Sequence, residues 1–211
     1  MAVKYTNSEL KAKLHRSTFQ VVKSSGIEGL TVRKVVQGCG LSDPYIYRCY
    51  SDLADLLKNA FMEIDEKVSQ LIAQVIQANI KDGLDWQNLD GICWGIWSAY
   101  WNFLMDDPEQ TVFYWRFYQS GHYNEELLQR RRENFNIFIG FMNEAGRVVR
   151  LQDKVNLDVL ISNIIDNTVS VAVKIHLGYM SEDDITSRTV YQSVFALLFH
   201  LLGQDVWKET A

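Results

Sequence analysis

The sequence predicts an all-α protein of about nine helices, and three observations support this fold class. The 211 residues include only two prolines, Pro44 and Pro108, and proline is the residue that most disrupts a helix interior. Apolar residues recur at spacings of three and four along most of the chain. Gly, Ser and Asp residues of the kinds that end or begin helices separate these periodic segments. With 47% hydrophobic residues, such a chain can bury a large core in one or two domains.

A first helix is expected to begin after Thr6 and to run to about Lys23. The spacing between Thr6 and Glu9 is that of a capping box, in which each side chain accepts a hydrogen bond from the other residue's backbone N–H. Apolar residues at helical spacing are expected to face the core, namely Leu10, Leu14, Phe19 and Val22.

Residues 26–57 predict short helices separated by a tight turn. Thr31 is the expected N-cap of a second helix, whose apolar stripe is formed by valines. The segment 38–40, Gly-Cys-Gly, should end this helix, because glycine enters left-handed conformations without steric cost. Ser42 is the expected N-cap of a third helix over residues 43–50. Pro44 falls in its first turn, where a missing N–H costs nothing.

The third helix has the residue pattern of a DNA-reading helix. Ile46 and Tyr50 are expected to pack inward, which leaves Tyr45, Tyr47 and Arg48 available to a partner. Two helices joined by a tight glycine-containing turn, the second bearing aromatic and basic side chains, are typical of a helix-turn-helix.

A long fourth helix is expected to begin with Ser51 as its N-cap and to continue to about Ile80, with leucines including Leu53 on its buried side. The segment 81–83, Lys-Asp-Gly, is the expected boundary with the rest of the chain. Five further helices are expected near residues 85–105, 108–119, 123–145, 155–178 and 182–203.

Charge is distributed unevenly along the chain. Residues 1–60 contain nine Lys/Arg and five Asp/Glu, a net charge of +4, whereas the remaining residues contain twelve against twenty-one, a net charge of −9. A basic N-terminal quarter in an acidic protein places positive charge where phosphate binding would require it. The alternative interpretation is that these lysines and arginines form a solvated helix face.

The second region is rich in aromatic residues. Trp94, Trp97 and Trp101 share one helix stripe, and Arg116 lies within the run Phe-Tyr-Trp-Arg-Phe-Tyr, which includes Trp115 and Tyr118. Such residues could line a pocket for a planar or amphipathic ligand, with the arginine binding an anionic group or stacking on a ring. Alternatively, the aromatic stripe is core, and Arg116 pairs with an acid such as Asp106 or Glu109.

A polar line crosses the apolar helix expected over residues 155–178. It consists of Asn163, Asn167, Ser170 and Lys174. The line could face solvent, offer hydrogen bonds to a ligand, or fix the register of a subunit interface.

Several functional classes have no support in the sequence. Three cysteines lack metal-ligand spacing, and the four histidines are scattered, so we expect neither a metal site nor a cofactor, and no enzyme activity. We read the arginines 130–132 as an exposed helix face. The N-terminal segment lacks the apolar core of a signal peptide, and the apolar stretch 91–105 is shorter than the ~20 residues needed to span a bilayer. We therefore expect a soluble, cytoplasmic protein without a membrane partner.

Residues 8–60 resemble the DNA-binding domain of the tetracycline-repressor (TetR) family of bacterial transcription regulators. The residues that carry the resemblance are Gly26, Thr31-Val32, Gly40-Leu41-Ser42, Ile46-Tyr47, Cys49-Tyr50 and Ser51-Asp52. The resemblance implies a helix-turn-helix DNA-binding domain over residues 1–58, with the motif at about 31–50. It also implies a helical ligand-binding and dimerisation domain over residues 59–211.

The resemblance also implies the partners and the residues that meet them. A homodimer, paired through its last two helices, would bind a palindromic DNA operator and be released by a small-molecule effector, aromatic or anionic. Tyr45 and Arg48 would contact base edges, and Thr31, Tyr47 and Lys58 would contact phosphates. The expected DNA-binding set also contains Arg33, Ser42, Asp43 and Pro44. The expected ligand-binding set is Trp94, Trp97, Trp101, Trp115, Arg116, Tyr118, Asn163 and Asn167.

Two residues depart from the family pattern. Asp43 stands near a position that is usually basic, and Leu53 stands near a lysine that meets a phosphate. Both residues weaken the expected contacts with the DNA backbone, and Arg33, Lys34, Arg48 and Lys58 could compensate. These departures favour a rival interpretation, a helical small-molecule or lipid carrier of the same fold that does not bind DNA.

Overall fold

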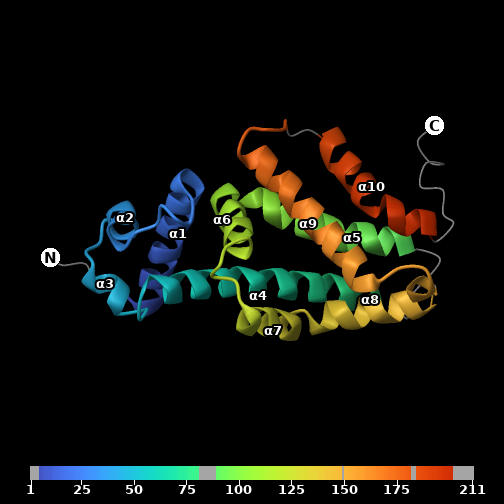
Figure 1. Cartoon of the computed structure of the whole chain (residues 1–211), viewed down its shortest axis with the longest axis horizontal. Helices are drawn as coiled ribbons and strands as arrows, with labels where there is room; N and C mark the ends of the chain where they lie inside the picture. Colours follow the sequence, from blue (N-terminus) through green and yellow to red (C-terminus); the bar gives the residue numbers. More distant parts are fainter. Residues whose placement is uncertain (1–4, 81–88, 149, 182–183, 202–211) are drawn as a thin grey trace. The chain divides into compact units, whose positions relative to one another are not determined.

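The computed structural model describes residues 5–80, 89–148, 150–181 and 184–201, and in these residues the fold is all-α, as the sequence predicts (Figure 1). The described segments contain ten α-helices, a short 3₁₀ helix and no strand. The α-helices are α1 (Asn7–Ser25), α2 (Val32–Gly38), α3 (Pro44–Tyr47), α4 (Leu53–Ile80), α5 (Leu89–Asp106), α6 (Pro108–Tyr118), α7 (Glu125–Asn134), α8 (Asn136–Val148), α9 (Leu157–His176) and α10 (Asp184–Leu201).

The tenth helix arises because the single helix expected over residues 123–145 is divided. Asn124 caps α7 by accepting a hydrogen bond from the Leu127 N–H at 3.1 Å, and the helix is interrupted at Phe135 before α8 continues to Val148. The predicted boundary at residues 81–83 lies outside the described residues, as do the first two residues of the last predicted helix, 182–183.

The chain forms two compact units, each built from two stretches of sequence. The first contains Met1–Lys67 and Asp107–Arg130, and the second contains Val68–Asp106 and Arg131–Ala211. The predicted functional division after residue 58 stays a prediction, since compactness does not say which residues bind DNA or a ligand.

The first unit begins with the capping box that the sequence predicts. Thr6 Oγ1 accepts a hydrogen bond from the Glu9 N–H at 3.2 Å, and Glu9 Oε2 accepts one from the Thr6 N–H at 2.8 Å. The predicted core residues Leu10, Leu14, Phe19 and Val22 are all buried. Helix α1 packs against α2 and α6.

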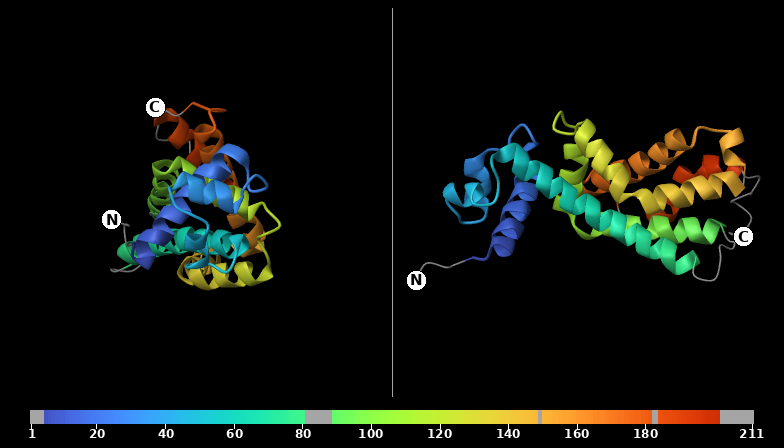
Figure 2. Two further views of the ribbon diagram at one scale, coloured as in Figure 1. Left: turned by 90° about the vertical axis from the view of Figure 1, so that its left-hand side faces the viewer. Right: turned by 90° about the horizontal axis from the view of Figure 1, so that it is seen from below.

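Helix α4 is one continuous helix whose residues belong to both units (Figures 1 and 2). The prediction that Ser51 caps it is wrong, because Asp52 takes that role. Asp52 Oδ1 accepts a hydrogen bond from the Asp55 N–H at 2.8 Å, while the backbone N–H of Ser51 donates to Asp55 Oδ2 at 2.9 Å. Asp52 directly precedes the first residue of the helix, Leu53, and this is the position from which a side chain can cap the first turn.

In the second unit, helices α5, α9 and α10 pack against one another. Hydrogen bonds between polar side chains link these helices within an otherwise apolar core. Tyr191 on α10 donates to Asp90 Oδ1 on α5 at 2.6 Å, and Trp97 Nε1 on α5 donates to Thr168 Oγ1 on α9 at 3.0 Å. Among the helices described, none is long and apolar enough to cross a membrane.

Candidate nucleic-acid interface and apolar cavity

The predicted helix-turn-helix is present in the first unit. Thr31 caps α2 by accepting a hydrogen bond from the Lys34 N–H at 3.3 Å. The turn that follows depends on Gly40, whose φ of 67° lies in the left-handed region that favours glycine. The Leu41 N–H then donates to the Val36 carbonyl oxygen at 2.8 Å, which closes the turn before α3.

Helix α3 is shorter than predicted, and its cap is not Ser42. The residue before the helix is Asp43, which has helical φ and ψ of −47° and −42° and makes no side-chain cap. The Ser42 carbonyl oxygen instead accepts a hydrogen bond from the Tyr45 N–H at 3.0 Å, so the backbone alone starts the helix. After Tyr47, the N–H groups of Cys49 and Tyr50 both donate to the Ile46 carbonyl oxygen at 2.9 Å, which turns the chain toward α4.

Buried residues fix α3 and its C-terminal turn in the first unit. Ile46 is fully buried, as predicted, and Tyr50 is buried. The Tyr50 hydroxyl donates to His15 Nε2 at 2.7 Å, and His15 Nδ1 lies 2.8 Å from Glu63 Oε2. Burial lowers the pKa of His15, despite the opposing charge of Glu63, so the imidazole is neutral at pH 7. Its proton therefore resides on Nδ1, which donates to the carboxylate.

The residues expected to contact DNA are mostly exposed. Tyr47 is 59% exposed, Arg48 is exposed, and Tyr45 is half-buried with its ring 5.7 Å from the Arg48 guanidinium carbon. The structure thus gathers these three side chains on and just after α3. The other exposed members of the set are Thr31, Arg33, Ser42, Asp43 and Pro44.

Lys58 differs from the rest of this set because it is already paired. Its ammonium donates to Glu126 Oε1 on α7 at 2.7 Å, and Arg130 Nη2 lies 3.2 Å from the same oxygen. Lys34 is also engaged, since its ammonium donates to the Gly29 carbonyl oxygen at 2.6 Å. Two of the basic residues that could compensate for Asp43 and Leu53 therefore hold local contacts.

The aromatic helix α6 belongs to the first unit and packs on α1 through reciprocal arginine contacts. Arg16 of α1 binds Asp107 Oδ2 at 2.5 Å and Glu109 Oε2 at 2.6 Å, at the start of α6. Near the end of α6, Arg116 donates to the carbonyl oxygens of Val22 and Lys23. Neither suggested acidic partner, Asp106 or Glu109, is the group that Arg116 binds. Trp115 and Tyr118 are half-buried neighbours, with ring centroids 6.1 Å apart.

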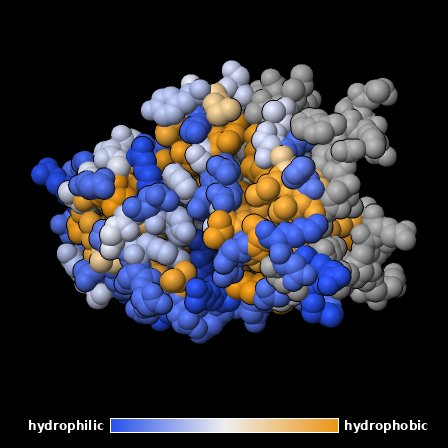
Figure 3. Space-filling view, turned by 45° about the vertical axis from the view of Figure 1, so that its right-hand side comes forward, coloured by the Kyte–Doolittle hydropathy of each residue, from blue (hydrophilic) through white to orange (hydrophobic). Residues whose placement is uncertain are grey.

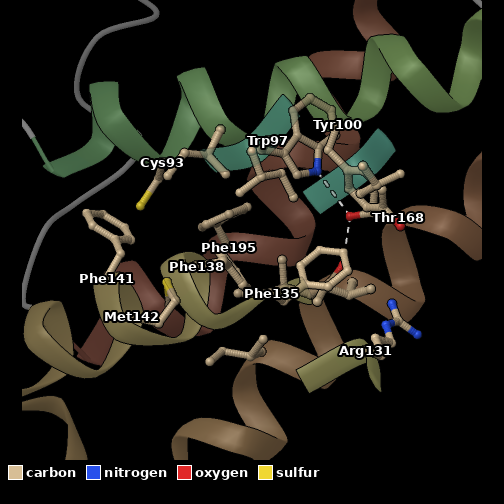
Figure 4. A pocket seen from close by; sticks show the side chains of 16 residues that line it. Cys93, Trp97, Tyr100, Arg131, Phe135, Phe138, Phe141, Met142, Thr168 and Phe195 are labelled. Carbon is tan, nitrogen blue, oxygen red and sulfur yellow. Dashed lines mark hydrogen bonds between the residues drawn. The ribbon is translucent and has the colours of Figure 1, made fainter. Parts of the chain in front are cut away.

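An apolar cavity lies within the second unit, among α4, α5, the C-terminal end of α7, α8, α9 and α10 (Figure 4). Its volume is about 60 Å³, several times the roughly 10–15 Å³ that one water molecule requires. The sixteen lining residues are Val68, Ile72, Cys93, Ile96, Trp97, Tyr100, Arg131, Phe135, Phe138, Phe141, Met142, Ile161, Ile164, Ile165, Thr168 and Phe195.

Of the eight residues expected to bind a ligand, this cavity includes only Trp97. Trp101 is buried and stacks on Trp97 with ring centroids 5.2 Å apart, whereas Trp94 is half-buried beneath the Arg188 guanidinium at 4.8 Å. Asn163 and Asn167 are exposed on α9, and Asn163 Nδ2 donates to its own helix at the Val159 carbonyl oxygen. Trp115, Arg116 and Tyr118 belong to the first unit.

Arg131 lines this cavity, whereas the sequence predicts that all three arginines 130–132 lie on an exposed helix face. Arg130 and Arg132 are exposed, but Arg131 is half-buried, with its guanidinium carbon 5.5 Å from the Phe135 ring centroid. The signal was present in the spacing, because Arg131, Phe135, Phe138 and Met142 recur at intervals of three and four on one helical stripe.

The side chains of Cys93 and His176, which could be reactive, make structural contacts instead. Burial raises the pKa of the Cys93 thiol to about 12, so this cavity residue is neutral. His176 Nε2 lies 2.8 Å from the Leu104 carbonyl oxygen and joins α9 to α5. In the described part of the chain, no three His, Cys, Asp or Glu side chains are grouped to hold a metal ion.

An exposed, basic and aromatic short helix after a glycine turn defines a helix-turn-helix protein, here combined with a helical unit that contains an apolar cavity. No protein-family model and no curated protein sequence matches the chain. Solved structures do match, and they show that the chain has the fold of TetR-family transcription regulators.

Three of these structures illustrate the similarity. A TetR family regulator from Marinobacter aquaeolei has a TM-score of 0.73 at 15% identity, over 89% of this chain and 94% of its own. The fatty acid degradation regulator FadR from Bacillus halodurans has a TM-score of 0.64 at 14% identity, over 97% and 99%. FadR from Bacillus subtilis, in complex with stearoyl-CoA, has a TM-score of 0.61 at 15% identity, over 87% and 96%.

Proposed function

We propose that the protein is a ligand-responsive transcriptional regulator of the TetR family, a repressor that binds a palindromic operator as a homodimer. The observation that carries the proposal is that α3 and the turn after it present Tyr45, Tyr47 and Arg48, while Ile46 and Tyr50 anchor the same segment in the core. A rigidly held helix with exposed aromatic and basic side chains suits major-groove reading. Such a role would place the protein in the cytoplasm.

The DNA contacts follow from exposure and charge. Arg48 and Tyr45 would reach base edges, since arginine pairs with guanine through two hydrogen bonds in the major groove. Thr31, Arg33 and Tyr47 would contact phosphates, and Ser42, Asp43 and Pro44 would face the duplex at the start of α3. Lys58 would reach a phosphate only by giving up its contact with Glu126.

The apolar cavity is the proposed effector site. Pockets for small molecules are typically lined by apolar and aromatic side chains with few polar groups, and this lining fits that description. The stearoyl-CoA complex of the Bacillus subtilis regulator supports an apolar effector for a protein of this fold. An effector that prefers one conformer would change the separation of the two recognition helices and lower operator affinity.

The proposed dimer forms through α9 and α10. Apolar side chains reach the surface of the molecule (orange in Figure 3), and on these two helices they include Val159 and Leu197, which are 56% and 50% exposed. Asn163 and Asn167 are exposed on α9 and could fix the register of the pair. Two recognition helices in one assembly are also what a palindromic site requires.

A second candidate, a small-molecule carrier that does not bind DNA, is favoured by two observations. Lys58 is paired with Glu126, and the acidic side chain of Asp43 is exposed at the start of α3, so the basic character of this surface is reduced. The two candidates differ in how they respond to salt, because specific DNA binding weakens steeply as salt rises.

The deciding experiment is selection of bound sequences from a random duplex pool, followed by titration of the selected duplex at two salt concentrations. We expect a palindromic motif, bound tightly and with strong salt dependence. The variant Arg48→Ala should lose about 1–3 kcal/mol of binding free energy and its preference at one base position. Enrichment of no sequence, with or without extracts containing effectors, would favour the carrier.

A further inference from the structure

We propose that the apolar cavity binds a small, neutral aromatic molecule of about one ring, and that it rejects ions and long acyl chains. The inference rests on the proposed function in taking the cavity as the effector site. It adds the size, the charge and the aromatic character of the effector.

The volume of the cavity limits the size of its ligand. At about 60 Å³ it has room for about four to six water-sized groups, because each requires roughly 10–15 Å³. A single aromatic ring has about this number of non-hydrogen atoms. In another protein, an engineered apolar cavity of about 150 Å³ stays dry and binds benzene. The cavity therefore suits one ring, and a molecule such as the stearoyl-CoA bound to Bacillus subtilis FadR is far too large for it.

The polarity of the cavity excludes ions. The described residues that line it give it an almost wholly apolar surface, so an ion would lose its hydration without gaining a partner. The Thr168 hydroxyl donates to the Ile164 carbonyl oxygen at 2.7 Å and accepts from Trp97 Nε1 at 3.0 Å, so its single hydrogen is used. Burial raises the pKa of the Cys93 thiol to about 12, which keeps it neutral.

Arg131 does not change this conclusion, because it lines the cavity through its aliphatic stem. The surface is almost wholly apolar, so the atoms that Arg131 contributes to it are carbons. Its guanidinium carbon lies 5.5 Å from the Phe135 ring centroid, at the edge of the cavity in Figure 4. Burial raises the pKa of Asp166 on α9, and the charge of Arg131 opposes this effect. The guanidinium therefore interacts with groups of the protein itself.

Aromatic rings form much of the lining, and they favour an aromatic ligand. The six rings are those of Trp97, Tyr100, Phe135, Phe138, Phe141 and Phe195. Aromatic pairs gain free energy beyond that of the buried area when they pack edge-to-face or with an offset. The thioether of Met142 also packs favourably on rings, and its unbranched side chain adapts to the shape of a ligand.

The half-buried side chains of the lining provide a route into the cavity. Phe138 and Met142 on α8 and Ile161 on α9 line the cavity and are also partly exposed to solvent. Partly exposed side chains change rotamer rapidly, so a single ring can enter without movement of a helix. Deeper in the cavity, the hydrogen bond between Trp97 and Thr168 holds the wall in place.

Calorimetric titration of the full chain with benzene, cyclohexane, naphthalene and benzoate tests the inference. We expect saturable binding of benzene and at least about hundredfold weaker binding of benzoate, whose charge would be buried without a partner. Each neutral ligand's affinity is divided by its partition coefficient from water into hexadecane, which removes differences in hydrophobicity. On that scale benzene should bind a few-fold to about tenfold more tightly than cyclohexane, and naphthalene more weakly than benzene.

Variants locate the binding in this cavity. Ile161→Phe fills part of the volume and should weaken benzene binding about tenfold or more. Ile137→Phe is the matched control, because Ile137 is 40% exposed on α8 and lies outside the lining, so benzene affinity should not change. Phe138→Leu removes one ring and should lower the ratio of benzene to cyclohexane affinity. Unfolding in urea establishes that each variant is folded.

The inference would be overturned if benzene did not bind, or if benzoate bound as tightly as benzene. Corrected affinities of cyclohexane or naphthalene equal to or above that of benzene would also overturn it, as would unchanged benzene affinity in folded Ile161→Phe. If Ile161→Phe does not fold, the four ligands on the wild type decide the matter. These titrations contain no DNA, so a failure of the proposed regulator function would appear separately, as the absence of a selected duplex.

Discussion

Tyr50 and His15 are joined by a hydrogen bond of 2.7 Å between the tyrosine hydroxyl and Nε2 of the neutral imidazole. Both side chains are buried, and their rings stack with centroids 5.8 Å apart. The bond connects the turn after α3 to α1, and the bond from His15 to Glu63 extends the network to α4. The position of the proposed recognition helix therefore depends on a polar network inside an apolar core.

Tyr50→Phe should destabilise the protein by about 1–3 kcal/mol, because it leaves buried Nε2 without its donor. The free energy of unfolding in urea would measure the loss. Tyr47→Phe is the matched control, since Tyr47 is 59% exposed and its change should be close to zero. Equal effects of the two substitutions would show that the hydroxyl of Tyr50 does not stabilise the fold.

Acidification should weaken the same network. Burial lowers the pKa of His15 in the folded state, so the unfolded chain binds a proton more readily below its usual value of about 6.5. Stability from neutral His15 is thus complete above that pH and is lost as the pH falls below it toward the folded pKa. Burial alone would raise the pKa of Glu63, but contacts with Lys67 and His15 outweigh it and lower the value, which adds a second loss below about 4.5.

The variant His15→Gln tests this assignment, because glutamine keeps a donor and an acceptor but does not titrate. Urea unfolding at a series of pH values should show a steeper decline for the wild type than for the variant between about pH 6.5 and pH 5. Parallel curves would mean that His15 does not contribute to the pH dependence.

Helix positions and the helix-turn-helix were predictable from sequence because they depend on neighbouring residues. The Thr6–Glu9 box, the Thr31 cap and the inward positions of Ile46 and Tyr50 all follow from local spacing. The caps predicted at Ser42 and Ser51 are wrong, because local spacing does not distinguish adjacent residues. An aspartate follows each serine, and sequence alone does not decide which of two adjacent residues begins the helix.

The residues of the candidate sites were harder to predict because their contacts join distant parts of the chain. Arg116 binds the carbonyl oxygens of Val22 and Lys23, which are 94 and 93 residues away. Lys58 binds Glu126, 68 residues away, and a triple-arginine run hides the half-buried Arg131 between two exposed neighbours. No periodic pattern encodes such pairs, since each depends on how the helices pack.

Gly40→Ala should destabilise the helix-turn-helix by about 1–2 kcal/mol, the cost of a left-handed backbone for a residue with a Cβ. A Cβ on Gly40 would have nothing within 4 Å, so conformation alone produces the effect. Gly121 is the matched control, because its Cβ would also meet open space and its φ is not positive. Gly121→Ala should be neutral or slightly stabilising in the same unfolding assay.

Thr168→Val should destabilise the protein by about 1–3 kcal/mol, although the two side chains have nearly the same shape. The valine would leave the buried Trp97 Nε1–H without its acceptor, now 3.0 Å away. Thr168→Ser keeps the hydroxyl and should retain most of the stability. A loss for serine as large as for valine would assign the effect to the missing methyl group and not to the hydrogen bond.

The pairing of Lys58 with Glu126 makes a prediction about DNA binding itself. If Lys58 reaches a phosphate, it must exchange the Glu126 carboxylate for that phosphate, so Glu126 competes with DNA. Glu126→Gln should then tighten binding to a selected duplex, whereas Lys58→Gln should weaken it and reduce the slope of log affinity against log salt by about one. The double variant should match Lys58→Gln, because Glu126 has no competing effect once the lysine is gone. Wild-type slope and affinity in Lys58→Gln would remove Lys58 from the interface and leave Glu126–Lys58 as a structural ion pair between α4 and α7.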